Sequence, residues 1–319
     1  MSSAQQQPPG PPYPLKGALL GGVPTTAIDV PVSACLLALF AVSAGIQLTI
    51  FLRNRRVHHR PFFPSILCFG LSMVRIITMA LRIAWAIHPF NPRLAIAANV
   101  FAQAGVVLLY VVNLILAHRT AVALLAPSYP RIVRPAAFLL QFCIFQVVAM
   151  IIALIVAIVY MLYTLDPTIR AHCRTVQLVA SPWLATLAFL PIPVVLLSLA
   201  TPRPAGTRRC GSGSMRTRIA LLLGAATALA LAAAYKTAGL YTALVPAPES
   251  WQVSRAPYYV FNAAIELCIL LVYAAARFDR RFFVGNWRTA EMPADAESRD
   301  VRAGRDGERT EKINEGEVQ

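Results

Sequence analysis

Residues 136–160 read AAFLLQFCIFQVVAMIIALIVAIVY, an unbroken run of twenty-five residues without a charged side chain. A helix needs about 20 mainly apolar residues to cross a hydrocarbon core of about 30 Å, so this run is long enough to span a bilayer. Six other apolar stretches of similar length lie on either side of it. We therefore predict seven spans, at residues 31–52, 62–87, 94–117, 136–160, 176–199, 219–241 and 257–276.

The composition agrees with a chain whose solvent is largely lipid. Hydrophobic residues make up 57% and charged residues 13% of it, whereas soluble domains have about 45–50% and about 25%. Because only helices satisfy their own backbone hydrogen bonds in lipid at this spacing, we predict an all-α fold. The predicted fold class is a polytopic membrane protein, with residues 31–288 forming a seven-transmembrane-helix bundle.

The basic residues predict how the chain is oriented. Sixteen Lys and Arg residues follow the first, third, fifth and seventh spans, and five lie on the other side. Because cytoplasmic loops carry the excess of Lys and Arg, we predict that the N-terminus is outside and the C-terminus is cytoplasmic. The same clustering explains the net charge of +15 without nucleic acid, which we do not expect as a partner. The longest spans favour the plasma membrane over internal membranes.

The two ends of the chain differ in composition from the spans. Residues 1–30 are rich in Pro and Gln, and we expect them to form an exoplasmic segment. Residues 289–319 hold nine acidic and five basic side chains and no aromatic one. Such a segment buries too little apolar surface to fold, so we predict a disordered cytoplasmic tail.

Four fully charged residues fall inside the predicted spans: Arg75, Arg82, Lys236 and Glu266. A charge at the centre of the bilayer costs at least about 2.5–3.5 kcal/mol, so these side chains should face the interior and find partners. Arg75 and Glu266 lie near the middle of their spans, and we predict that they form an ion pair. Arg82 and Lys236 lie near the outer ends of theirs, where either could extend to the interface.

Three interpretations of these charges remain open. The first is a structural Arg75–Glu266 pair with two cations that reach the interface. The second is an outward-facing cavity whose surplus positive charge attracts an anionic group, such as a lipid phosphate or a carboxylate. The third is a proton relay through Glu266.

Polar residues also line one face of two spans. In the third span, spacings near 3.5 residues place four polar side chains together: Asn99, Gln103, Tyr110 and Asn113. The seventh span repeats the pattern with Tyr259, Asn262, Glu266 and Tyr273. Such residues either hold helices together or contact a ligand. The candidate ligand-binding residues are therefore Arg75, Arg82, Lys236, Glu266, Asn262, Asn99, Gln103 and Asn113.

Enzyme signatures are missing from the sequence. There is no Walker A motif, no Gly-x-Ser-x-Gly and no His-Glu-x-x-His. The five histidines lie at span ends or in loops and do not gather with carboxylates in a metal-binding pattern. We expect no catalytic activity, no metal and no cofactor.

Several segments resemble a family of fungal seven-helix membrane proteins that is often labelled "family C-like G-protein-coupled receptor". They are LRIAW at 81–85 with HP at 88–89, AGVVLLYVVNLI at 104–115, and YYVFN at 258–262 with FDRRF at 278–282. The last span, with Glu266 and the exit at 279–282, also distantly resembles the fungal lipid-translocating exporters of the RTA-like group. The first resemblance implies a receptor-like protein and the second implies a lipid translocator.

Three functions follow as expectations. The favoured one is receptor-like sensing of a small or anionic ligand, with a cytoplasmic signalling partner. The alternatives are a transporter or lipid translocator, and a structural membrane protein without a ligand. The lipid bilayer is a partner in every case, and an anionic small molecule or lipid is the candidate ligand.

Overall fold

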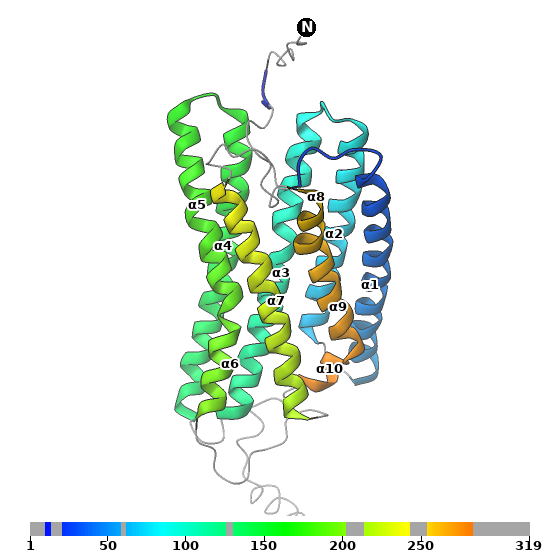
Figure 1. The fold of residues 1–319 in the computed structure, drawn as a ribbon. Helices are drawn as coiled ribbons and strands as arrows, with labels where there is room; N and C mark the ends of the chain where they lie inside the picture. The colour runs from blue at the N-terminus through cyan, green and yellow to red at the C-terminus, as the bar shows by residue number, and fades with distance from the viewer. Residues whose placement is uncertain are drawn as a thin grey trace, which may run out of the picture. The chain divides into compact units, whose positions relative to one another are not determined.

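The computed structural model describes residues 10–13, 21–58, 62–125, 130–201, 214–242 and 254–282. The predicted tail at 289–319 and most of the segment 1–30 lie outside these ranges. The described residues contain helices and no strand (Figure 1). The helices are α1 Asp29–His58, α2 Phe63–Ile87, α3 Pro92–Leu125, α4 Pro130–Tyr163, α5 Pro167–Phe189, α6 Pro191–Ala200, α7 Met215–Thr242, α8 Arg255–Tyr259, the π-helix η2 Val260–Ala264, α9 Ile265–Ala275 and α10 Phe278–Arg281.

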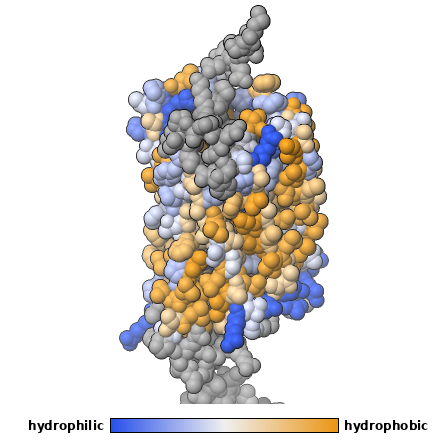
Figure 2. All heavy atoms as spheres, in the orientation of Figure 1, coloured by the Kyte–Doolittle hydropathy of each residue, from blue (hydrophilic) through white to orange (hydrophobic). Residues whose placement is uncertain are grey.

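The predicted fold class is confirmed. Within the described residues, seven helical segments are long and apolar enough to cross a membrane. Two of them are compound, because α5 continues into α6, and α8 continues through η2 into α9. Hydrophobic residues cover the middle of the face drawn in Figure 2, and hydrophilic residues gather toward its two ends. The chain is a multi-pass membrane protein.

Several helices extend beyond the predicted spans. The third span was predicted to end at residue 117, whereas α3 continues to Leu125, and α5 begins at Pro167 instead of residue 176. The prediction measured only the apolar part of each helix. A helix continues through polar residues at the membrane surface because its backbone hydrogen bonds stay within the segment.

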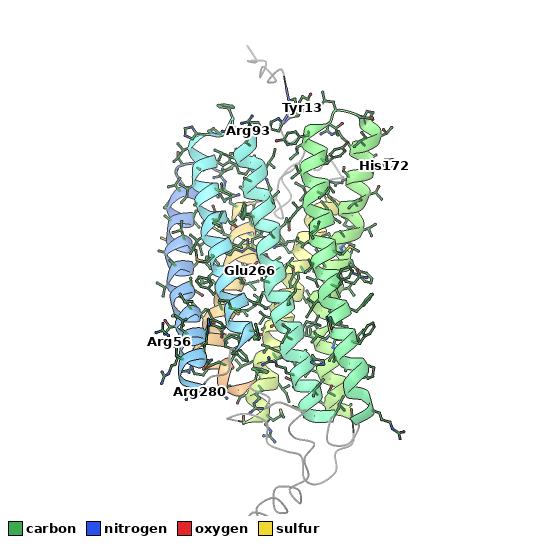
Figure 3. The ribbon with its side chains drawn as sticks, turned by 180° about the vertical axis from the view of Figure 1, so that it is seen from behind. Tyr13, Arg56, Arg93, His172, Glu266 and Arg280 are labelled. Carbon is green, nitrogen blue, oxygen red and sulfur yellow. The ribbon has the colours of Figure 1, made fainter. Side chains whose placement is uncertain are left out.

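Labelled residues from different loops show which loops lie at each end of the bundle. Figure 3 places Arg93 and His172 at the end where α1 begins, which we call the Asp29 end. It places Arg56 and Arg280 at the opposite end, which we call the Arg280 end. Loops assigned to the same side from sequence therefore do meet at one end of the bundle. The side of the membrane on which each end lies stays a prediction.

Helix α3 lies at the centre of the bundle. It packs against α2, α4, α5, α6 and α7, and 67% of its most apolar stretch is buried, compared with 22% for α4. The exposed side chains of α4 are mostly large and apolar, and include Phe138, Phe142 and Phe145, as expected for a lipid-facing surface. Polar residues of α3 are therefore held inside the protein.

Proline residues interrupt the helix of the fifth span. Helix α5 ends at Phe189 and α6 starts at Pro191, because Pro191 has no N–H to continue the hydrogen-bond ladder. Pro182, inside α5, likewise leaves the carbonyl of Leu178 without its usual donor. The hydroxyl of Tyr241 in α7 donates to that carbonyl at 2.8 Å. The proline thus creates a bond between two spans.

Candidate functional site

Arg75 and Glu266 form the central ion pair. The Nε of Arg75 donates to Oε2 of Glu266 at 2.6 Å, and its Nη2 donates to Oε1 at 2.5 Å. Both side chains are fully buried, and Glu266 lies near mid-height of the bundle in Figure 3. The pair predicted from equal depth is confirmed. A bidentate arginine–carboxylate pair is the strongest hydrogen-bonded form of such a contact.

The surroundings of Arg75 hold it in one position. Its Nη1 donates to the carbonyl of Ala102 in α3 at 3.1 Å. Gly105, one turn further along α3, lies so close that a Cβ atom there would be 3.2 Å from Cζ and Nε of Arg75. A side chain larger than hydrogen at position 105 would therefore press on the guanidinium. Helix α3 thus supplies both an acceptor and the space for the charge.

Arg82 belongs to a second buried cluster, with Asp29. The Nη2 of Arg82 lies 2.9 Å from Oδ1 of Asp29, and the same oxygen accepts the Tyr259 hydroxyl at 2.7 Å. Asp29 is fully buried and Arg82 is 3% exposed. The interpretation of Arg82 as a cation that extends to the interface is therefore wrong, because it has a buried carboxylate partner.

Sequence reasoning missed Asp29 because it lies two residues before the predicted start of the first span. Its signal was available: an acidic residue directly precedes an apolar run, at the same end of the bundle as Arg82. The structure adds two aromatic contacts, with Cζ of Arg82 at 4.1 Å from the ring centroid of Tyr258 and 5.2 Å from that of Tyr259. Stacking of this kind further stabilises a desolvated guanidinium.

The segment before α1 closes over this cluster. The carbonyl of Gly21 accepts a hydrogen bond from Nη2 of Arg82 at 3.1 Å. Gly21 has a φ of 78°, and a Cβ atom there would lie 2.5 Å from the Tyr258 ring, so only glycine fits. Thr25 donates its backbone N–H to Oδ2 of Asp29 at 2.8 Å. The chain ahead of the first span is thus tied to the second and seventh spans.

Lys236 is buried, and its amine has no hydrogen-bond partner in the part of the chain that the structure describes. Its side chain is 7% exposed, and no acceptor among the described residues reaches its Nζ. It is close enough to interact electrostatically with Glu266 and Arg75, but the carboxylate of Glu266 already binds Arg75. The interpretation of Lys236 as a cation that extends to the interface is also wrong, because its amine is buried inside the bundle.

The Lys236 side chain lines a cavity of about 70 Å³. The cavity lies between α3, α4, α5 and α7, and its polar wall is formed by Gln103, Tyr110, Gln177, Ser181 and Lys236. A water needs roughly 10–15 Å³ of such volume, so a few waters or a small anion would fit. We call this space the Lys236 cavity.

Two hydrogen bonds join α5 and α7 next to the Lys236 cavity. Ser181 and Thr237 share a hydrogen bond of 3.0 Å, and Nη2 of Arg174 donates to the carbonyl of Leu240 at 2.7 Å. Ser181 and Leu240 themselves line the cavity. The two helices are therefore joined by polar contacts at Thr237 and Leu240, one and four residues after Lys236.

The structure separates the polar residues of the third span into different environments. Gln103 lines the Lys236 cavity. Asn113 is buried and accepts a hydrogen bond from the Tyr273 hydroxyl in α9, so it joins helices together. Asn99 is half-buried and donates to the carbonyl of Ala95 in its own helix at 2.8 Å. Of these three candidates, only Gln103 lies at the cavity.

The polar residues of the seventh span all face the interior. All four are buried, as their spacing predicts: Tyr259, Asn262, Glu266 and Tyr273. Asn262 lies in η2, one turn before Glu266. A π-helical turn inside a longer helix often marks a functional position. The irregular turn here connects the residue that binds Asp29, Tyr259, with the residue that binds Arg75.

A third polar cluster lies at the Arg280 end. Asp279 accepts hydrogen bonds from Asn54 in α1 at 3.0 Å and from Arg277 at 3.2 Å. Burial alone would raise the pKa of the Asp279 carboxyl, but these donors outweigh it and hold the pKa below its usual range. Arg277 has a φ of 49°, in the left-handed region, where the chain turns from α9 into α10. The cluster fixes this turn against α1.

In the described residues, no three His, Cys, Asp or Glu side chains gather as metal ligands. Comparison with protein-family models, with curated proteins and with solved structures finds no match to this chain.

Proposed function

We propose that this membrane protein is receptor-like and binds a small anionic ligand in the Lys236 cavity. The observation that carries the proposal is the Nζ of Lys236, which is buried and has no acceptor among the described residues, on a side chain that lines a cavity. An unpaired ammonium group inside a bilayer costs at least about 2.5–3.5 kcal/mol. An anion in the cavity removes that cost, which is the source of its affinity.

The charges near the cavity favour an anion over a cation. Arg75 and Glu266 neutralise each other through their two hydrogen bonds. Lys236 then leaves one positive charge among the described residues that interact there. Gln103 and Ser181 also line the cavity and carry hydrogen-bond donors. The cavity volume of about 70 Å³ restricts the ligand to a few heavy atoms, such as a small carboxylate.

A transporter is the second candidate, and the breaks in two spans favour it. The fifth span is interrupted at Leu190 and the seventh contains η2. Discontinuous helices near a central binding site are typical of secondary transporters. A receptor holds the anion and changes conformation, whereas a transporter releases it on the other side. Flux of a labelled anion into proteoliposomes distinguishes the two.

The test is a thermal-unfolding series on the purified full-length protein at constant ionic strength. Formate, acetate and bicarbonate are compared with chloride, in the wild type and in Lys236→Met. We expect at least one small carboxylate to raise the unfolding temperature of the wild type and to leave Lys236→Met unchanged. Arg93→Met is the matched control, because Arg93 is exposed at the Asp29 end, and it should respond like the wild type.

Lys236→Met also has an expected effect without ligand. Removing a buried charge that has no partner should raise the unfolding temperature in chloride. Equal stabilisation of wild type and Lys236→Met by every anion, or no stabilisation of either, contradicts the proposed site.

A further inference from the structure

A second site lies on the outside of the bundle, away from the Lys236 cavity. An apolar groove of about 440 Å³ runs between α1 and the η2 region. Pro31, Val32, Cys35 and Leu36 form one wall, and Tyr259, Val260 and Ala264 form the other. We call it the α1–η2 groove. Both walls belong to helices that cross the membrane, so the groove opens toward lipid.

The irregular turn contributes to this groove. Val260 and Ala264 are the first and last residues of η2, and Val260 is 47% exposed. Ala264 and Cys35 are small, so neither wall fills the space between the helices. Figure 1 shows α1 beside the compound helix α8–η2–α9 along this side of the bundle. A groove without polar lining at this depth matches an acyl chain.

A positively charged residue, Arg255, lies at the end of the groove. Arg255 is one turn before Tyr259 on the same helix, and its side chain is 35% exposed. Its Nε lies 3.5 Å from Oδ2 of Asp29, while Oδ1 of that carboxylate already accepts Arg82 and Tyr259. Asp29 therefore balances only one of the two arginines. The surplus positive charge is accessible on Arg255, because Arg82 is 3% exposed.

We propose that the α1–η2 groove binds a glycerophospholipid of the surrounding leaflet, with an acyl chain in the groove and its phosphate on Arg255. The guanidinium fork matches a phosphate group, which accepts two parallel N–H donors. Arg255 is the first residue of its span, at the depth where lipid phosphates lie. The apolar groove and the adjacent cation thus fit the two halves of one lipid molecule.

The test uses Cys35 as a reporter, since this thiol is exposed and lines the groove. Purified full-length protein in detergent is treated with a membrane-soluble maleimide, and labelling of each cysteine is measured by peptide mass spectrometry. Cys268 is the internal control, because it is also exposed in the seventh span but does not line the groove. Dioleoylphosphatidylcholine is compared with dioleoylglycerol, which has the same chains and no phosphate.

We expect phosphatidylcholine to slow labelling of Cys35 at about fivefold lower concentration than dioleoylglycerol, since one basic residue near a membrane surface contributes about 1 kcal/mol. Labelling of Cys268 should not change. Arg255→Gln should remove the difference between the two lipids, and Ala264→Leu, which fills the groove, should weaken both. Arg93→Gln removes an exposed arginine at the same end and should behave like the wild type.

Two results overturn the proposal. One is equal protection of Cys35 by both lipids in the wild type, which means that the headgroup is not recognised. The other is protection that follows protein concentration instead of lipid concentration, which identifies the groove as a contact between copies of the chain. Neither result bears on anion binding at Lys236, so the two proposals fail independently.

Discussion

Removing one partner of the Arg75–Glu266 pair should damage the protein more than removing both. Glu266→Gln removes the negative charge opposite Arg75 and one of the two oxygens that accept its hydrogen bonds of 2.6 and 2.5 Å, while the Ala102 carbonyl still accepts at 3.1 Å. Breaking a buried pair in this way costs about 3–5 kcal/mol. The double variant Arg75→Met/Glu266→Gln carries no orphaned charge at the pair, and should cost about 2 kcal/mol or less.

The position of Lys236 makes the two single variants unequal. After Arg75→Met, Glu266 still has Lys236 as a neighbouring cation, so part of the lost interaction is replaced. We therefore expect Arg75→Met to destabilise the protein by about 2–3 kcal/mol, at or below the lower end of the usual cost of breaking a buried pair. After Glu266→Gln, two cations remain without an acid. Adding Lys236→Met to Arg75→Met leaves Glu266 without a nearby cation, and should restore the full cost.

The assay is equilibrium unfolding of the purified protein in mixed micelles, with increasing SDS and tryptophan fluorescence as the signal. Arg93→Met, an exposed position, is the control for removing a charge. If the double variant costs the sum of the two single variants within about 0.5 kcal/mol, the residues are energetically independent. That result refutes the reasoning. The reasoning is also refuted if Arg75→Met and Glu266→Gln lower the free energy of unfolding equally and adding Lys236→Met to Arg75→Met does not change the loss.

Three further outcomes follow from the other contacts. Asp29→Asn and Arg82→Gln should each destabilise the protein by about 3 kcal/mol, because each change leaves a buried charge unpaired. The double variant should destabilise it by less than the sum of the two. Mixed-micelle unfolding measures all three variants. Tyr273→Phe removes the hydroxyl that donates to Asn113. It should lower the free energy of unfolding by about 0.6 kcal/mol, and at most by about 1.7 kcal/mol, as for other hydrogen bonds between membrane helices. A loss above 3 kcal/mol in the same assay contradicts this prediction. The pKa of Asp279 is depressed in the folded protein, so its stabilising contribution is fully present above the unfolded pKa and is lost as the pH falls below about 3.8. Asp279→Asn should therefore flatten the loss of stability between pH 5 and pH 3. Identical pH profiles of the wild type and Asp279→Asn refute this prediction.

The seven spans could be predicted from sequence because hydropathy is a local property. Each span needs only its own apolar residues to be stable in lipid, since its backbone hydrogen bonds are internal. Residues 136–160 and the other six runs therefore predicted the helices of the bundle. The Arg75–Glu266 pair was also within reach, because depth in the membrane follows from position along a span, and two opposite charges at equal depth attract strongly.

The Asp29–Arg82 pair was not predicted, since a carboxylate just outside an apolar run was counted with the flanking segment. Its burial depends on Gly21 and Thr25, which precede α1, and on Tyr259 from the seventh span. The same limit applies to Lys236. Sequence placed it in a span, but the lack of an acceptor and the cavity beside it result from how side chains of four helices pack.

The sequence by itself determined the seven apolar spans, the depth of each charge along its span and the interior face of the seventh span, because hydropathy and helical period are properties of a single segment. Only the tertiary structure decided that Asp29 pairs with Arg82, that Lys236 has no acceptor among the described residues, where a cavity remains and where the α1–η2 groove opens. The physical reason is that pairing and packing depend on distances between helices, and those distances are fixed by side chains that no single segment contains.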